Sequence, residues 1–138
     1  MAGKCAPLFA FLLVLVAADA SLAEHELHYR YTVLGYVKET TGTVRSRVEV
    51  ELVREKTGFS YLGRTDETGL YVIVARLGDE SVGEKLRLQA AGRTLTITAR
   101  FDPADHLHER GTRVDFIGER TVETPTAFAT TLGRFLAQ

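Results

Sequence analysis

The chain has 138 residues, with 17 basic and 18 acidic side chains, four histidines, one cysteine and no tryptophan. This length fits a single domain, and the scattered, nearly balanced charges exclude the basic stripe that a nucleic-acid-binding protein needs. The lone cysteine, Cys5, excludes a disulfide framework and a thiolate metal site.

The N-terminal residues predict an export signal. Lys4 gives a short positive start, and an uncharged, mostly aliphatic run follows over residues 6–18. This run is shorter than the roughly 20 apolar residues that span a bilayer, and the small residues that end at Ala20 and Ala23 suit a signal peptidase. We therefore expect residues 1–23 to be a cleavable signal peptide, cut after Ala20 or Ala23. The mature chain would be periplasmic or secreted, with no membrane span and no cysteine.

The rest of the chain alternates between apolar and polar residues with a period of two, which is typical of strands with one buried face. Turn residues interrupt the alternation repeatedly, as in a sandwich of short strands. The expected strands, in chain order, are 27–38, 47–52, 59–63, 70–77, 86–90, 94–101 and 114–116. These segments predict an all-β, seven-stranded antiparallel β-sandwich over residues 24–118. Its edge strands leave dimerisation by edge pairing open, and they do not fix the oligomeric state.

The tail, residues 119–138, has a different period. Its apolar residues lie at i, i+4, i+7 and i+8, namely Phe128, Leu132, Phe135 and Leu136. This spacing predicts one short amphipathic helix that starts near Pro125. Such a helix either caps an open end of the sandwich or presents an apolar docking peptide to a partner, and an apolar stripe usually packs on its own core.

Three motifs in the predicted strands are similar to a known family. They are Gly-Tyr-Val at residues 35–37, the alternating aliphatics at residues 48–52, and Thr-Asp-Glu-Thr-Gly-Leu-Tyr-Val-Ile at residues 65–73. Together they resemble the carboxypeptidase regulatory-like, transthyretin-like β-sandwich over residues 29–118. The resemblance implies a transthyretin-like (prealbumin-like) fold and a non-catalytic module of an exported or surface protein, of a kind involved in folding support, adhesion, and ligand or carbohydrate contact.

Catalytic patterns are weak. The enzymatic branch of the transthyretin-like group, the 5-hydroxyisourate hydrolases, ends in Tyr-Arg-Gly-Ser, whereas this chain ends in Gly-Arg-Phe-Leu-Ala-Gln. No serine lies in a nucleophile-elbow context, and no glycine-rich loop could cradle a phosphate. We therefore predict that the chain is not an enzyme, and that it binds or supports an envelope or extracellular protein or glycan.

The histidines suggest an alternative function. They form two pairs, His25 with His28 and His106 with His108. Imidazole is a common transition-metal ligand, so four of them could hold copper or zinc in a small periplasmic metal-binding protein. Neighbouring acids of the loop over residues 102–110 could add oxygen ligands. Against this alternative, the first pair lies close to the new N-terminus and the second in a polar surface loop. The sequence implies no other cofactor.

Overall fold

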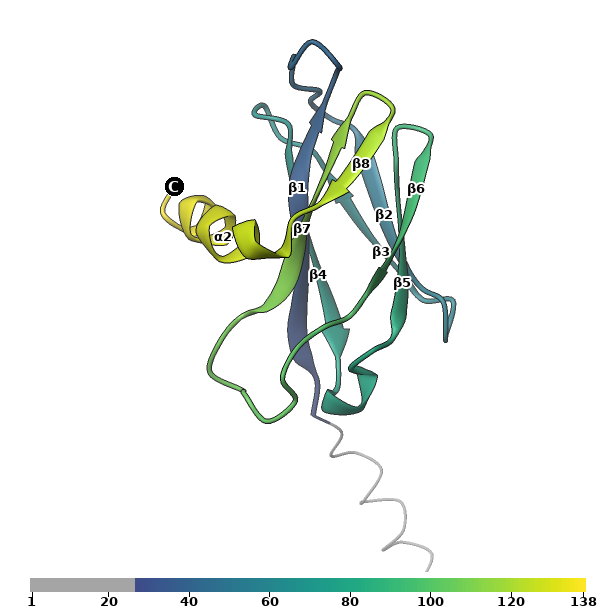
Figure 1. The fold of residues 1–138 in the computed structure, drawn as a ribbon, viewed down its shortest axis with the longest axis vertical. Helices are drawn as coiled ribbons and strands as arrows, with labels where there is room; N and C mark the ends of the chain where they lie inside the picture. The colour runs from purple at the N-terminus through teal and green to yellow at the C-terminus, as the bar shows by residue number, and fades with distance from the viewer. Residues whose placement is uncertain (1–26) are drawn as a thin grey trace, which may run out of the picture.

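The structure is a computed structural model that describes residues 27–138; the predicted signal peptide and His25 lie outside these residues. Two four-stranded sheets, with strand orders β4-β1-β7-β8 and β3-β2-β5-β6, enclose one core (Figure 1). The elements are β1 (Tyr29–Lys38), β2 (Glu49–Arg54), β3 (Ser60–Arg64), β4 (Leu70–Leu77), the 3-10 turn η2 (Asp79–Ser81), β5 (Lys85–Ala90), β6 (Arg93–Thr98), β7 (Arg110–Ile117), β8 (Arg120–Glu123), the 3-10 turn η3 (Pro125–Ala127) and α2 (Phe128–Leu136). No helix within the described range is long and apolar enough to cross a membrane.

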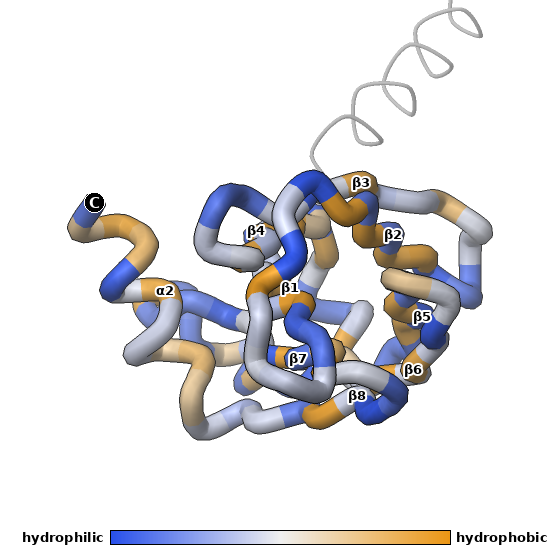
Figure 2. The backbone as a smooth tube through the Cα atoms, turned by 90° about the horizontal axis from the view of Figure 1, so that it is seen from above, coloured by the Kyte–Doolittle hydropathy of each residue, from blue (hydrophilic) through white to orange (hydrophobic). Residues whose placement is uncertain are grey.

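The core lies between the two sheets and comes from the alternation seen in the sequence. One face of each strand is buried, as for Val33 of β1, Leu52 of β2, Ile73 of β4 and Leu88 of β5. Because successive side chains of a strand point to opposite faces, the polar residues between them lie outside. Viewed from above, the sheets form two layers, and α2 lies beside the layer that contains β1 and β7 (Figure 2).

The predicted strand count and direction were wrong. The structure has eight strands within residues 27–138, because the tail contributes β8 before its helix. β8 has four residues, Arg-Thr-Val-Glu, with a single apolar side chain, so it gives no periodic signal. It pairs with β7 after a turn at Gly118, where φ is 58°. The sheets are also not purely antiparallel, because β1 and β7 pair in parallel. Alternation reports which face is buried and does not report the direction of a neighbouring strand.

The pairing of β1 with β7 is interrupted in its middle. The ladder runs as far as Leu34–Arg113 and resumes at Val37–Phe116. At the interruption β1 has Gly35, where a Cβ atom would collide with the carbonyl oxygen of Val114.

Side chains replace the hydrogen bonds that the interrupted ladder lacks. Tyr71, which pairs directly with Gly35 on the other side of β1, donates its hydroxyl to the Val114 carbonyl at 2.6 Å. The Tyr36 N–H donates to Oδ1 of Asp115 at 2.9 Å. Burial raises the pKa of Tyr71 well above its ordinary value, so the hydroxyl keeps the proton that it donates.

The predicted C-terminal helix is confirmed, and α2 packs on the outer face of β1 and β7 rather than over an end of the sheets. The buried ring of Phe128 lies against Gly111, where a Cβ would overlap the ring. Arg113 pairs with Asp115 at 3.1 Å and donates to Oγ1 of Thr131 at 2.9 Å. These contacts fasten the helix to β7 and cover the outer face of the sheet at β1 and β7.

The Tyr71 hydroxyl should matter for stability. Replacing Tyr71 with Phe leaves the buried Val114 carbonyl without its donor, so we expect a loss of about 1–3 kcal/mol in the free energy of unfolding, measured by urea denaturation. Tyr61→Phe is the matched control, because that hydroxyl donates to the exposed Arg76 carbonyl at 3.5 Å. Equal losses in the two variants would contradict this account.

Gly35 should be irreplaceable. Gly35→Ala forces β1 away from β7, and we expect a loss of about 4 kcal/mol or more, or failure to fold. In Gly133→Ala the new methyl group meets no atom within 4 Å, and helix propensity predicts a gain of up to about 1 kcal/mol. Thermal unfolding of both variants tests the contrast, and a stable Gly35→Ala protein would refute the steric argument.

Candidate functional site

The three histidines within residues 27–138 lie at or near one end of the sheets. His106 makes a hydrogen bond from Nε2 to Oδ2 of Asp79 at 2.8 Å, and its ring stacks on Tyr29 with centroids 4.4 Å apart and planes 10° apart. His108 uses Nδ1 to contact Oδ2 of Asp105 at 2.7 Å. His28 is exposed at the start of the described chain.

Arg110 is the centre of this end of the molecule. Its side chain is 6% exposed, and the guanidinium lies between the rings of Tyr29, at 4.9 Å, and Phe101, at 4.2 Å. Nη2 donates to Oδ1 of Asp79 at 2.9 Å and to the Asp105 carbonyl at 3.1 Å. Asp79 therefore accepts from both His106 and Arg110, and it joins η2 to the loop before β7.

Two carboxyl groups of this cluster are held in their ionised form. Desolvation raises the pKa of Asp79, but the hydrogen bonds from His106 and Arg110 outweigh it, and the net shift is downward. The backbone N–H groups of Leu107 and His108, together with the His108 ring, lower the pKa of Asp105. The histidines of this loop thus bond to carboxylates that stay charged.

This geometry bears on the predicted metal ligands His25, His28, His106 and His108. The rings of His106 and His108 are directed at two different carboxylates, and no three or more His, Cys, Asp or Glu side chains gather into a metal-binding group within residues 27–138. A hollow of about 220 Å³ lies between β1 and this loop. Because His25 lies outside the described residues, the four-histidine site stays a prediction.

The sequence drew attention to the loop over residues 102–110 but did not predict the contacts that hold this loop in place. Tyr29, Asp79 and Arg110 were not predicted as a unit, because they come from β1, η2 and β7. Asp79 precedes His106 by 27 positions, and no local pattern signals such a contact.

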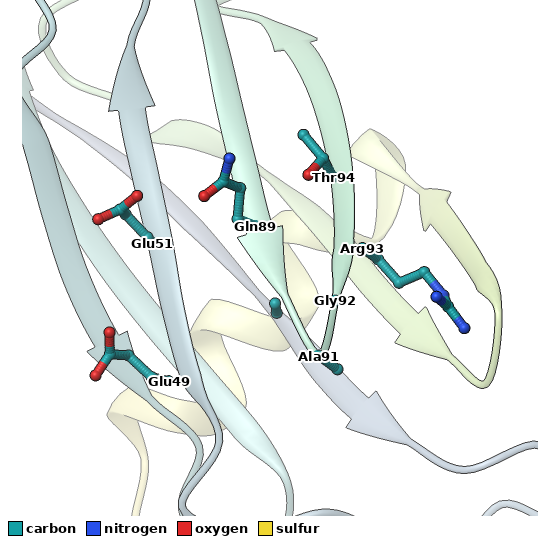
Figure 3. A pocket seen from close by; sticks show the side chains of 8 residues that line it. Glu49, Glu51, Gln89, Ala91, Gly92, Arg93 and Thr94 are labelled. Carbon is teal, nitrogen blue, oxygen red and sulfur yellow. The ribbon is translucent and has the colours of Figure 1, made fainter.

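A second candidate site lies on the outer face of the sheet β3-β2-β5-β6. Cross-strand pairing places one row of side chains across all four strands: Leu62, Glu51, Gln89 and Thr94. Glu49 lies two positions before Glu51 and shares its face. A hollow of about 410 Å³ is lined by Glu49, Glu51, Gln89 and Thr94 and by the turn at residues 90–93, and the carboxylates, the amide and the hydroxyl lie along it in Figure 3.

The polar side chains of this row, which we call the polar row (Glu49, Glu51, Gln89 and Thr94), are unpartnered. None of them makes a hydrogen bond or ion pair with another side chain or backbone group in the described part of the chain. Beside the row, Nε of Arg87 is buried without a hydrogen-bond partner among residues 27–138. Glu84, by contrast, is an acid that pairs with a base, Arg54, at 2.7 Å. The hydrogen-bonding groups of the polar row are therefore not used within the described part of the chain.

Comparisons with known proteins give little further guidance. No protein-family model matches the chain, and no curated protein matches it. Among solved structures, the chain is similar to the dioxygenase domain of a dioxygenase carbohydrate-binding protein fusion from the cellulolytic bacterium Streptomyces sp. SirexAA-E. The identity is 18%, 68% of this chain and 82% of that chain are covered, and the TM-score is 0.43.

That match corrects one expectation. The prediction that the chain is not an enzyme is contradicted by similarity to a dioxygenase domain, and we withdraw it. A TM-score of 0.43 carries no argument for an activity of this chain, so none is assigned.

Asp79 should hold the loop over residues 99–109. In Asp79→Asn, Arg110 loses its charged partner, so we expect faster amide hydrogen exchange across residues 101–109 at pH 7. Asp102→Asn is the control, because Asp102 uses its side chain to accept from the Ala104 N–H, which an asparagine oxygen can also do. Unchanged exchange in Asp79→Asn would show that the stacked rings alone hold the loop.

Proposed function

We propose that this chain is an exported module that binds a macromolecule of the envelope or extracellular space, with the outer face of sheet β3-β2-β5-β6 as its binding surface. One observation carries the proposal: α2 covers β1 and β7 on the outer face of the opposite sheet, while the polar row lies unpartnered on this face. The exported location rests on the signal peptide predicted for residues 1–23.

We further propose that the two sheets form a β-sandwich of the carboxypeptidase regulatory-like, transthyretin-like type. The residues behind the resemblance have clear structural roles, which supports this assignment. Gly35 and Tyr71 face each other across β1 and β4. In the turn before β4, Oδ1 of Asp66 accepts from the N–H groups of Thr68, at 2.8 Å, and Leu70, at 3.1 Å, and Gly69 has a φ of 80°.

The chemistry of the face favours a glycan over a protein as the ligand. The cores of protein interfaces are rich in aromatic residues and methionine and poor in glutamate, whereas the polar row offers carboxylate, amide and hydroxyl groups. Leu62, which is 62% exposed, is the apolar end of the row. Carboxylate and amide oxygens accept from sugar hydroxyls, and amide and guanidinium N–H groups donate to them. An extended glycan could therefore use one row across several strands.

Binding assays on envelope fractions test this proposal. The purified protein should bind polysaccharide isolated from its own host, and Glu51→Ala with Gln89→Ala should weaken binding by about tenfold or more, since each lost hydrogen bond contributes about 1 kcal/mol. Glu67→Ala is the matched control, because Glu67 is an exposed acid in the turn before β4, outside the polar row.

Two results would contradict the proposal. One is a double variant that binds as tightly as the wild type while keeping the same unfolding midpoint. The other is binding that is confined to the protein fraction of the envelope, which would assign the face to a protein partner.

A further inference from the structure

The free edge of β6 is unlike the other sheet edges. Among the described strands, β4, β8, β3 and β6 form the edges. β4 and β3 protect each other: the Tyr61 hydroxyl accepts from the Arg76 N–H at 3.3 Å, and Gly63 lies against Ile73. β8 has only four residues, with Arg120 and Glu123 at its ends. Short or covered edges of this kind resist pairing with another chain.

β6 approaches β8 at a few positions only, and along most of its length it lacks these protections. It reads Arg-Thr-Leu-Thr-Ile-Thr, with no proline and no charge after Arg93. Arg93, its first residue, is tied to the other sheet by an ion pair with Glu119 at 3.1 Å. Beyond it, Thr94 and Thr96 are exposed and Leu95 is half-buried. An uncharged strand rich in threonine and aliphatic residues at a sheet edge is a template for a further strand.

The hairpin geometry fixes which backbone groups are available. The β5–β6 turn has two residues, Ala91 and Gly92, with φ of 51° and 73°. Such a turn closes on a hydrogen-bonded pair, here Ala90–Arg93, and hydrogen-bonded pairs then alternate along the ladder. The Ala99 N–H donates to the Glu84 carbonyl at 2.8 Å, in phase with this alternation. The remaining residues, Thr94, Thr96 and Thr98, therefore direct their N–H and C=O groups to the free edge.

We propose that two copies of this chain pair antiparallel through β6, about a two-fold axis at Thr96. In this register Thr96 opposes Thr96 of the second copy, Thr94 opposes Thr98, and Leu95 opposes Ile97. Every outward backbone group of the three threonines then finds a partner. Cross-strand threonine pairs on the outer face and aliphatic pairs on the inner face are favourable combinations, and a strand paired with itself satisfies the symmetry of a two-fold interface.

The second copy is favoured over an unrelated peptide because the segment is complementary to itself. The sequence from Thr94 to Thr98 keeps its residue classes when it is reversed about Thr96. No charges oppose each other along it, and Arg93 faces Ala99 of the second copy in this register. One strand pair buries less than the roughly 1,200–2,000 Å² of a typical stable interface, so the dimer should form in a concentration-dependent way.

Pairing would also extend the candidate binding surface. The two four-stranded sheets would become one continuous sheet, because edge pairing preserves the outer face. The polar rows of both copies would then lie on the same side of that sheet. A dimer could contact one long ligand at two places, which raises overall binding without any new contact.

The test uses residue 96, which opposes itself only in the proposed register. Sedimentation velocity of the purified protein over a range of concentrations should show a monomer–dimer equilibrium. Thr96→Lys and Thr96→Glu should each weaken dimerisation by about tenfold or more, because like charges would lie directly opposite. An equimolar mixture of the two variants should recover the dimer, because the introduced ammonium group of one copy would then oppose the introduced carboxylate of the other. Thr130→Lys on the exposed side of α2 is the control and should dimerise like the wild type.

Several outcomes would overturn the proposal. If the wild-type protein stays monomeric at every concentration, β6 does not pair with a second copy. That result would favour a peptide of another protein as the partner of this edge. Thr96→Lys dimers as strong as those of the wild type, or a mixture that recovers no dimer, would exclude pairing about Thr96. Unfolding midpoints of all variants confirm that the monomers are intact. None of these results depends on glycan binding, so this proposal can fail while the proposed function stands.

Discussion

The fold depends on how the break between β1 and β7 is bridged. Gly35 lets β1 pass the Val114 carbonyl, Tyr71 reaches across from β4 to donate to that carbonyl, and Asp115 accepts from the Tyr36 N–H. Three strands are thereby joined at one buried point. Asp115 also orients Arg113, which holds Thr131 of α2. The same small network therefore sets the strand pairing and places the C-terminal helix.

The position of α2 makes the two sheets different. One sheet packs against the core on its inner face and beneath the helix at β1 and β7 on its outer face, which explains why β1 is buried almost throughout. The other sheet has a core face and a polar face, as antiparallel sheets at a protein surface commonly do. Because the side chains of the polar row are unpartnered, we propose that face as the binding surface. The histidine loop, in which Asp79 accepts hydrogen bonds from both His106 and Arg110, is better explained as a structural clamp.

Features that depend on local periodicity could be predicted from the sequence. The alternation from β1 to β6 predicted a sandwich of two sheets. The spacing of Phe128, Leu132 and Phe135 predicted a short helix. Features that depend on contacts between residues far apart in the sequence could not be predicted. The parallel direction of β7 and the existence of β8 follow from pairing, and β8 has one apolar residue to signal it. The four histidines drew attention to residues 106–108, yet the partners of that loop lie at residues 29 and 79. The polar row requires the register of β2, β5 and β6, which no single strand contains.

The central claim is that the outer face of sheet β3-β2-β5-β6 binds an extracellular macromolecule. The most direct measurement is a map of backbone amide chemical shifts by NMR during titration with envelope polysaccharide from the host. The account predicts that the shifts change along the polar row and its neighbours, at residues 49–51, 87–89 and 94–96. Changes confined to residues 101–110, or to the exposed side of α2, would contradict it.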